Sequence, residues 1–411
     1  MTHLISFAAL FASVILLQLS AGGVGPLDVL SGMVLDFSTP HIGLLGSAHF
    51  LGFFIGCWWA PRMMGNVGHS RAFAAFTATG AMALLAHMLV VDPLAWAVMR
   101  IGSGISVAGC YTVVEAWLQA KVTNETRGRA LGVYRVTDLM AQLGSQLMIA
   151  VLVPASYVSY NILALICCAA LIPITLTTAR QPDIPKAPRL RPLLAWEKSP
   201  MAVAAVIVAA VSSSSFRMVS PIYASEVGLE QHLLGYFMAA LVAGGALAQY
   251  PVGWLADKFD RRKVLMGLSI AAIFTCVGIS LTSNLSDTWI LVTAILFGLS
   301  AFPIYSVAAA HAHDYAVDDE RIALSAALMF WFAVGAIAAP YTASMVMDRF
   351  GPAALFVVIS ASYAILIIFG MWRMGVREAV KSTRYIYAPR TSFIIGGLLK
   401  GARKPEEPLD R

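Results

Sequence analysis

Repeated apolar stretches of about 20 residues are the feature of this sequence that most limits how it can fold. As a helix, each stretch is long enough to cross about 30 Å of hydrocarbon. The chain has 411 residues, 59% of them hydrophobic, and a mean hydropathy of +0.76, which is more apolar surface than a water-soluble fold of this size buries. The sequence therefore predicts an all-α polytopic membrane protein.

Twelve membrane-spanning helices are predicted, joined by short polar connections. No Lys or Arg precedes the first apolar stretch, so it lacks the charged start of a signal peptide and is interpreted as the first span. The predicted spans are 4–26, 42–62, 72–91, 94–119, 130–153, 157–178, 200–223, 232–254, 264–283, 288–311, 323–346 and 351–372.

Positive charge is distributed unevenly among the connections. All but four of the 28 Lys and Arg residues fall in the even-numbered connections and in the tail, whereas the odd-numbered connections carry mainly Asp and Glu. By the positive-inside rule, the even-numbered side and both termini face the cytoplasm of an inner cell membrane. The net charge of +6 is then a topology signal, and we expect no nucleic-acid partner.

A long proline-rich connection divides the predicted spans six and six. We predict an N-terminal six-helix bundle (1–179), a cytoplasmic linker (180–199), a C-terminal six-helix bundle (200–372) and a cytoplasmic tail (373–411). "AKVTNETRGRAL" after span four and "YAVDDERIAL" after span ten are similar, as duplicated halves would be. The tail either lies on anionic headgroups or stays in solvent.

A dense charged motif, "GWLADKFDRRKV" (253–264), follows span eight. With the six-plus-six spans, it resembles the cytoplasmic-loop signature of the major facilitator superfamily, and "VGHSRAF", "NETRGR" and "DRR" resemble a bacterial subgroup of that family. The resemblance implies two six-helix pseudo-repeats and a cytoplasmic latch between spans eight and eleven. Its residues here are Gly253, Asp257, Lys258, Arg261 and Arg262.

Two features limit this reading. Asp260 stands where the family usually has Gly, and the counterpart after span two keeps Arg62 but no acid. A plain positive-inside loop is the alternative, although it explains neither Gly253 nor Asp257.

Charged side chains inside spans four and five are candidates for proton coupling, because an ionisable group in a membrane helix is costly and usually functional. "RIGSGISVAG" also resembles the fourth-helix motif of the family, which implies a role for Arg100 in proton transfer; the alternative is that Arg100 extends to the outer interface. Glu115 is either a proton site or an inner-gate partner of Arg127 or Arg129. Arg135 and Asp138 either couple protons or simply pair with each other. The candidates are Arg100, Glu115, Arg135, Asp138 and Gln142.

In the second half, the substrate-cavity candidates are Arg217, Tyr305 and Trp331. Arg217 either binds an anionic group or extends to the outer surface, and the aromatic residues either stack on a solute or pack helices. The run "HAHD" (311–314) is interpreted as a hydrogen-bond cluster, not as a metal site. Pro221 and Pro303 are expected to weaken their helices.

These features predict a secondary transporter that moves a small organic solute by alternating access, coupled to protons. The solute is either a hydrophobic compound or an organic anion. The rival hypotheses are a sensor or assembly factor without flux, a facilitator without proton coupling, and a membrane enzyme. No phosphate loop, zinc helix or hydrolase elbow occurs, so we predict no enzyme activity and no cofactor. We expect a monomer in the lipid bilayer, with the solute and protons as its partners.

Overall fold

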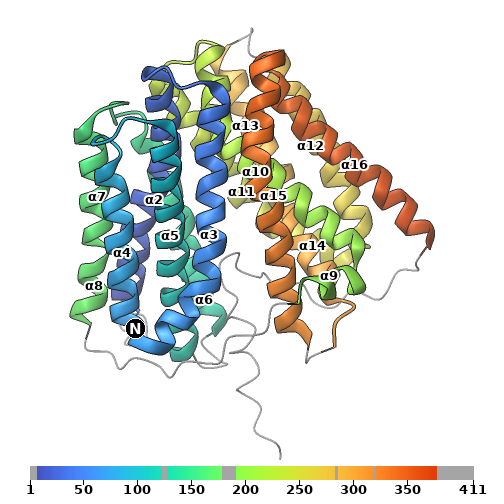
Figure 1. Ribbon diagram of the computed structural model, residues 1–411. Helices are drawn as coiled ribbons and strands as arrows, with labels where there is room; N and C mark the ends of the chain where they lie inside the picture. The colour runs from blue at the N-terminus through green and yellow to red at the C-terminus, as the bar shows by residue number, and fades with distance from the viewer. Residues whose placement is uncertain (1–6, 123–126, 178–190, 283–285, 318–319, 377–411) are drawn as a thin grey trace, which may run out of the picture.

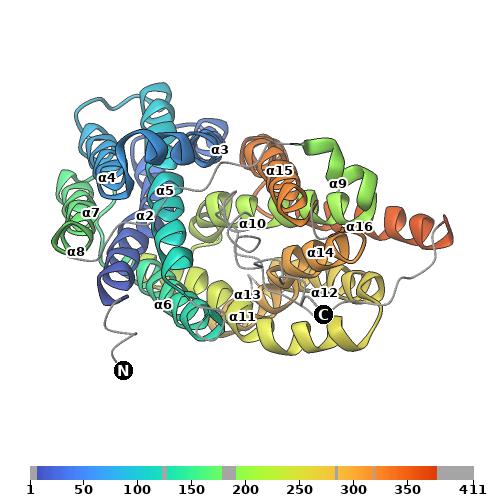
Figure 2. The ribbon, with the colours of Figure 1, turned by 90° about the horizontal axis from the view of Figure 1, so that it is seen from below.

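The computed structural model describes residues 7–122, 127–177, 191–282, 286–317 and 320–376. The described residues form helices and no strands. Figures 1 and 2 show the blue to green helices α2–α8 beside the yellow-green to red helices α10–α16, and we call these groups the N-terminal half and the C-terminal half. The predicted tail lies outside the described residues from 377 onward.

The N-terminal half contains α2 (Ala8–Val34), α3 (Thr39–Val67), α4 (His69–Ala86), α5 (Pro93–Lys121), α6 (Arg127–Met148), α7 (Tyr157–Ala169) and α8 (Leu171–Leu176). The C-terminal half contains α10 (Pro200–Glu226), α11 (Gln231–Lys258), α12 (Arg261–Thr282), α13 (Asp287–Ala301), α14 (Pro303–His313), α15 (Arg321–Phe350) and α16 (Ala354–Val376). Between them, part of the predicted linker forms the short helix α9 (Pro192–Lys198).

Ten helical segments are long and apolar enough to cross a membrane, with α7 and α8 counted as one segment and α13 and α14 as another. Helices α4 and α6 are not among the ten. Helix α6 is less apolar than α4 and more amphipathic, with its polar residues gathered on one side. The multi-pass helical fold is thus confirmed, and the count of twelve spans stays a prediction.

Prolines interrupt two of the predicted spans. Helix α13 stops at Ala301 and α14 begins at Pro303, because a proline inside a helix has no N–H and its ring clashes with the carbonyl four residues earlier. Pro173 lies just after the break between α7 and α8. Pro221, by contrast, lies inside α10 without interrupting it. Of the two prolines expected to weaken their helices, Pro303 therefore coincides with an interruption, whereas the helix continues through Pro221.

Large apolar side chains point outward from the bundle as well as into it. Among the exposed ones are Leu89, Val98, Tyr250, Phe274 and Val357. A soluble protein rarely exposes so many, whereas hydrocarbon around a bundle solvates them without cost. The outer surface of both halves is therefore suited to lipid.

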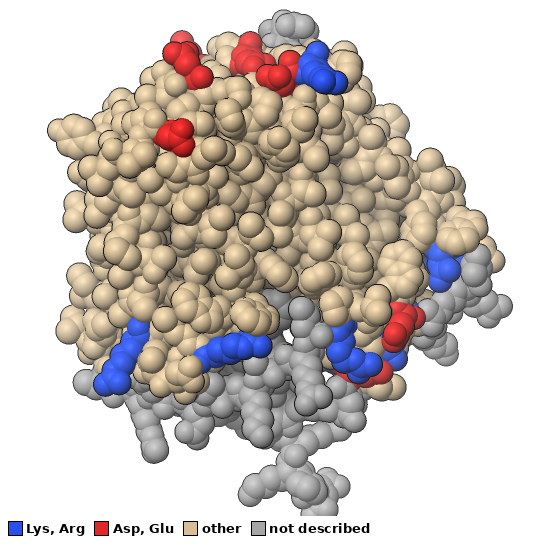
Figure 3. Space-filling view, viewed as in Figure 1, with Lys and Arg blue, Asp and Glu red and all other residues tan. Residues whose placement is uncertain are grey.

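The two ends of the bundle differ in charge (Figure 3). One end, which we call the acidic end, carries exposed Asp36, Asp92, Glu230, Asp287 and Asp348. The other, the basic end, carries Arg62, Arg71, Lys121, Lys198 and Lys258. Arg349 is the exposed arginine of the acidic end. This separation agrees with the uneven distribution of charge along the sequence.

Polar contacts between the halves lie toward the acidic end. The N–H of Tyr341 on α15 donates to Ser47 Oγ on α3 at 3.1 Å. The amide of Gln231 on α11 donates to the carbonyl of Ile149, just after α6, at 2.8 Å. Helix α3 also packs along α15, and α6 along α11. The halves are therefore held together near the acidic surface.

Candidate functional site

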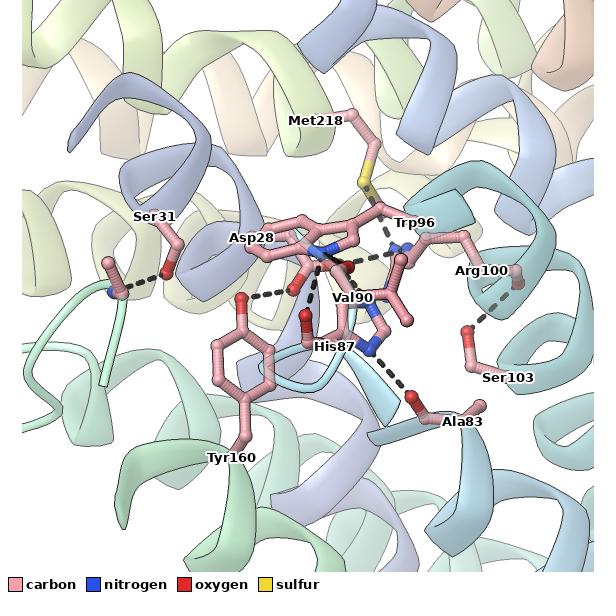
Figure 4. A network of polar contacts seen from close by, with 11 residues as sticks. Asp28, Ser31, Ala83, His87, Val90, Trp96, Arg100, Ser103, Tyr160 and Met218 are labelled. Atoms are coloured by element: carbon pink, nitrogen blue, oxygen red, sulfur yellow. Dashed lines mark hydrogen bonds and ion pairs between the residues drawn. The ribbon is translucent and has the colours of Figure 1, made fainter. Parts of the chain in front are cut away.

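A buried carboxylate, Asp28, lies at the centre of a polar network in the N-terminal half (Figure 4). Its Oδ1 accepts a hydrogen bond from Tyr160 Oη at 2.8 Å. Its Oδ2 lies 3.4 Å from Arg100 Nε and 3.4 Å from His87 Nε2. These four side chains come from α2, α5, α7 and the end of α4, and each is at most 2% exposed. Such burial is costly unless the charges are paired, so the network is a strong candidate for function.

His87 presents its two ring nitrogens to different partners. Its Nδ1 lies 2.6 Å from the carbonyl oxygen of Ala83, which only accepts, so Nδ1 carries a hydrogen. Its Nε2 faces Asp28 Oδ2, so the imidazole lies between the carboxylate and the last turn of α4.

The network is held in place by its surroundings. The indole N–H of Trp96 donates to the carbonyls of His87 and Val90, at 2.8 and 3.0 Å. The rings of His87 and Tyr160 stack, with centroids 5.1 Å apart and planes 14° from parallel. Asp92 caps α5 by accepting from the N–H groups of Leu94 and Ala95, which positions the start of the helix that carries Trp96 and Arg100.

Arg100 connects the carboxylate to the other half of the molecule. Its Nη2 lies 3.8 Å from the sulfur of Met218 on α10. Arg100 also lines a small internal pocket, together with His49, Ser103 and Ser106. His49 lies within electrostatic reach of both Arg100 and Arg217. Arg100 therefore faces Asp28, the interface between the halves and an internal pocket.

A second network joins α2, α5 and α6. Tyr111 Oη donates to Asp138 Oδ1 at 2.8 Å and also contacts Gln18 Oε1. Arg135 Nη1 lies 2.9 Å from Asp138 Oδ2. The structure thus pairs Arg135 with Asp138, as one of the two sequence interpretations expects. Gln142 is buried one turn further along α6.

Glu115 lies one turn from Tyr111 along α5, toward the basic end, and within electrostatic reach of it. It is 2% exposed and accepts a hydrogen bond from Tyr134 Oη on α6 at 3.1 Å. The side chains of Arg127 and Arg129, its expected gate partners, lie outside the described residues. The geometry places Glu115 at the contact between α5 and α6.

The three substrate-cavity candidates of the second half do not form one cluster. Arg217 is half-buried on α10. Tyr305 is 4% exposed and packs edge-on against Phe332, with ring centroids 5.4 Å apart. The indole N–H of Trp331 donates to the carbonyl of Pro192 at 3.0 Å. The structure therefore places Trp331 against the linker helix α9, where it packs between elements.

The charged motif forms a compact cluster at the basic end of the C-terminal half. Gly253 is buried in α11, and the ammonium group of Lys258 lies 4.8 Å from the centre of the Trp254 ring. Arg261 forms an ion pair with Asp314, after α14, and donates to the carbonyl of Ala310 at 3.0 Å. Asp257 Oδ1 lies 3.5 Å from Arg261 Nη2. These contacts connect α11, α12 and α14, and the latch to span eleven stays a prediction.

Asp260, the departure from the family motif, has a structural role of its own. Its Oδ1 accepts from the backbone N–H of Arg262 at 2.9 Å, which caps the start of α12. Its Oδ2 accepts from Arg262 Nη2 at 2.9 Å. Burial by itself raises the pKa of Asp260, but these hydrogen bonds and the charge of Arg262 outweigh it and hold the pKa below its ordinary value.

Sequence reasoning missed Asp28, His87, Tyr160 and His49. The first span was predicted to end at 26, whereas α2 continues to Val34 and contains Asp28. A signal was present, because Leu27, Val29 and Leu30 prolong the apolar run on both sides of the acid. His87 and Tyr160 carried no signal, because only the packing of α4 and α7 brings them to Asp28.

Comparisons with known proteins agree with this architecture. The sequence profile described as Major Facilitator Superfamily matches residues 201–403. An uncharacterized MFS-type transporter of Yersinia enterocolitica is 25% identical over 324 residues, which cover 78% of this chain and 84% of the relative. The uncharacterized MFS-type transporter YcaD of Escherichia fergusonii is 25% identical over 329 residues, covering 79% and 84%.

Two solved structures share the fold. The nucleoside transporter NupG superposes with a TM-score of 0.71 at 14% identity, over 89% of this chain and 98% of that one. A bacterial homolog of the human lysosomal transporter Spinster, in an inward-facing and occupied conformation, superposes with a TM-score of 0.68 at 15% identity, over 95% and 94%. The helical architecture and these relatives lead to one assignment: the chain belongs to the major facilitator superfamily of transporters.

Proposed function

We propose that this transporter moves a small organic solute across a bacterial inner membrane by alternating access, and that proton binding drives the movement. The observation that carries the coupling proposal is the Asp28 carboxylate, which is buried against both Arg100 and His87. A buried carboxylate between two basic groups binds or loses a proton only with a change in its partners, which is what coupling requires.

The proposed orientation puts the basic end in the cytoplasm, where the positive-inside rule places Lys and Arg. Both termini are then cytoplasmic. The two halves are proposed to act as rigid bundles, 1–179 and 200–372, joined by the linker 180–199, in a monomer. The polar contacts between them lie toward the acidic end, which suits a state that is closed outside and opens inside.

Proton binding is proposed to act on the interface through Arg100. When Asp28 is ionised, the Arg100 guanidinium is held at its carboxylate. A proton on Asp28 removes that charge, so Arg100 turns to its other neighbours, the internal pocket and Met218 of the opposite half. The protonation state of Asp28 thereby changes the contact between the halves.

The other buried acids, Asp138 and Glu115, are proposed to support the structure and the gate. Asp138 is neutralised by Arg135 and oriented by Tyr111, so it fixes α6 to α2 and α5. Gln142 continues the same polar face. Glu115 is proposed to take part in the inner gate, because it lies toward the basic end and already bridges α5 and α6 through Tyr134.

The proposed solute is an organic anion. His49 on α3 lies within electrostatic reach of both Arg100 on α5 and Arg217 on α10, so this group of basic residues comes from both halves. An anionic group bound among them would contact both halves at once, as a midplane site in alternating access must. Tyr305 is too buried against Phe332 to stack on this solute in the present conformation.

The test begins with the purified protein in detergent and a thermal-shift screen of carboxylate and phosphate metabolites. Compounds that raise the melting temperature are then assayed in proteoliposomes with and without a pH gradient. We expect accumulation that requires the gradient. Flux that is indifferent to the gradient would indicate a facilitator, and binding without flux would indicate a sensor.

A further inference from the structure

A small pocket at the basic end of the C-terminal half lies away from the network of Asp28. It is lined by Ser199, Pro200 and Met201 at the start of α10, and by Arg262, His311, Tyr315 and Arg373. The predicted linker, the charged motif and the last helix all meet here. We propose that this pocket binds a phosphate group, either that of an anionic phospholipid or a free phosphate.

His311 gives the first argument for a ligand. It is 5% exposed, and within the described part of the chain its ring makes an edge contact with Tyr315 but no hydrogen bond. A buried imidazole without a hydrogen-bond partner is unfavourable. Because His311 lines the pocket, an acceptor bound there would satisfy its N–H.

The start of α10 supplies a second donor. Ser199 caps this helix, since its Oγ accepts from the N–H of Ala202 at 3.1 Å and its carbonyl accepts from the N–H of Val203. Pro200 has no N–H, and the N–H of Met201 has no acceptor among the residues that the structure describes. The positive end of the 27-residue helix therefore presents a backbone donor to the pocket.

The charged side chains that line the pocket favour an anion, because they are the arginines Arg262 and Arg373. Arg262 is paired with Asp260, whereas Arg261 behind it faces both Asp314 and Asp257. Arg373 adds a positive charge, and its guanidinium lies 5.6 Å from the centre of the Trp372 ring. Arginine, imidazole and a helix N-terminus are common donors to phosphate oxygens.

The position of the pocket suits a lipid headgroup. It lies at the basic end, where the interface with the cytoplasm is proposed, and such basic pockets between helices bind anionic headgroups. On the same helix as Arg373, Met371 is 56% exposed and Trp372 is 61% exposed. These side chains would contact acyl chains while the phosphate enters the pocket.

The test measures binding of phosphatidylglycerol to the purified, delipidated protein by native mass spectrometry. We expect His311→Gln and Arg373→Gln to weaken binding at least fivefold. Arg349→Gln, which removes an exposed arginine at the acidic end, is the control and should bind as the wild type does. Arg373 lies at a helix end, so its variant remains informative even where His311→Gln folds poorly.

Inorganic phosphate distinguishes the two sources of the ligand. If millimolar phosphate competes with the lipid for the wild-type protein but not for Arg373→Gln, the phosphate group alone is sufficient for binding. If phosphate does not displace the lipid but both variants weaken lipid binding, the ligand is the headgroup of a lipid anchored in the membrane. Wild-type affinity for phosphatidylglycerol in both variants would overturn the proposal.

Discussion

The two halves are built around the same helix crossing. In the N-terminal half, Gly52 on α3 lies against the carbonyl oxygen of Ile101, and Gly104 on α5 lies against that of His49. In the C-terminal half, Gly244 on α11 lies against the carbonyl oxygen of Ile295, and Gly298 on α13 against that of Leu241. A Cβ at any of these glycines would overlap the facing backbone, so the close approach requires glycine in both halves.

Aligning the glycines of the two crossings in the sequence shows where the halves differ. Aligning Gly104 with Gly298 places Arg100 at the position of Ala294, and aligning Gly52 with Gly244 places His49 at Leu241. Among the described residues, the buried Asp, Glu, Lys and Arg of the N-terminal half are Asp28, Arg100, Glu115 and Asp138, whereas those of the C-terminal half are Arg261 and Arg262 at its basic end. Among the described residues, one crossing geometry thus supports buried charges along the interior of one half, and buried charges only at the basic end of the other.

The largest expected effect concerns the polar interior. Arg100→Gln leaves Asp28 buried without its guanidinium, and the free energy of unfolding should fall by about 3–5 kcal/mol. The double variant Asp28→Asn with Arg100→Gln should recover part of this loss, because the uncompensated charge is gone. Denaturant unfolding in detergent measures both. Losses that simply add would contradict the ion-pair assignment.

The charged motif gives the next effect, at the opposite end of the other half. Arg261→Gln should cost about 2–3 kcal/mol, because Asp314 and the carbonyl of Ala310 lose a buried charged donor. The matched change in the degraded motif of the N-terminal half, Arg62→Gln, should cost less than about 1 kcal/mol because Arg62 is exposed. Equal losses would contradict the asymmetry between the basic ends.

The shared crossing predicts equal effects in the two halves. Gly52→Ala and Gly244→Ala should each cost about 1–3 kcal/mol, because the added methyl meets a backbone carbonyl that a side-chain rotation cannot move. Gly267→Ala, where the added Cβ meets open space, is the control and should be neutral or slightly stabilising. Unequal melting temperatures for the first two variants would show that the crossings are not equivalent.

The smallest effect concerns Asp260. Because its folded-state pKa is lowered, its contribution is present above the unfolded pKa of about 4 and is lost as the pH falls through the lower folded value. Asp260→Asn should flatten the dependence of the melting temperature on pH between about 5 and 3. The difference should stay below about 1 kcal/mol, because the side chain is partly exposed and its charge is screened. An unchanged slope would show that the cap does not depend on charge.

The sequence was sufficient to predict the helical membrane fold and the distribution of charge, and it singled out Arg100 as an ionisable residue inside a span. These follow from local patterns, since hydropathy and an arginine inside an apolar run are visible without any packing. The sequence also offered the pairing of Arg135 with Asp138 as one of two interpretations, because the two residues lie three positions apart on one helix.

What the sequence did not predict depends on contacts between distant segments. Asp28, His87, Arg100 and Tyr160 meet only because α2, α4, α5 and α7 pack around one point. Likewise, the sequence left Trp331 open between stacking on a solute and packing helices, and the hydrogen bond to Pro192, 139 residues earlier, is a long-range contact that it did not indicate. Periodicity indicates which face of a helix is polar and not which partner that face meets.

The central claim is that the N-terminal half carries the proton site at Asp28, and Asp28→Asn tests it most directly. Proteoliposomes containing this variant are compared with wild type and with Asp138→Asn, using a solute found in the binding screen. We predict that Asp28→Asn loses accumulation driven by a pH gradient and retains solute exchange without a gradient, whereas Asp138→Asn keeps both. Gradient-driven accumulation at the wild-type level in Asp28→Asn would contradict the account.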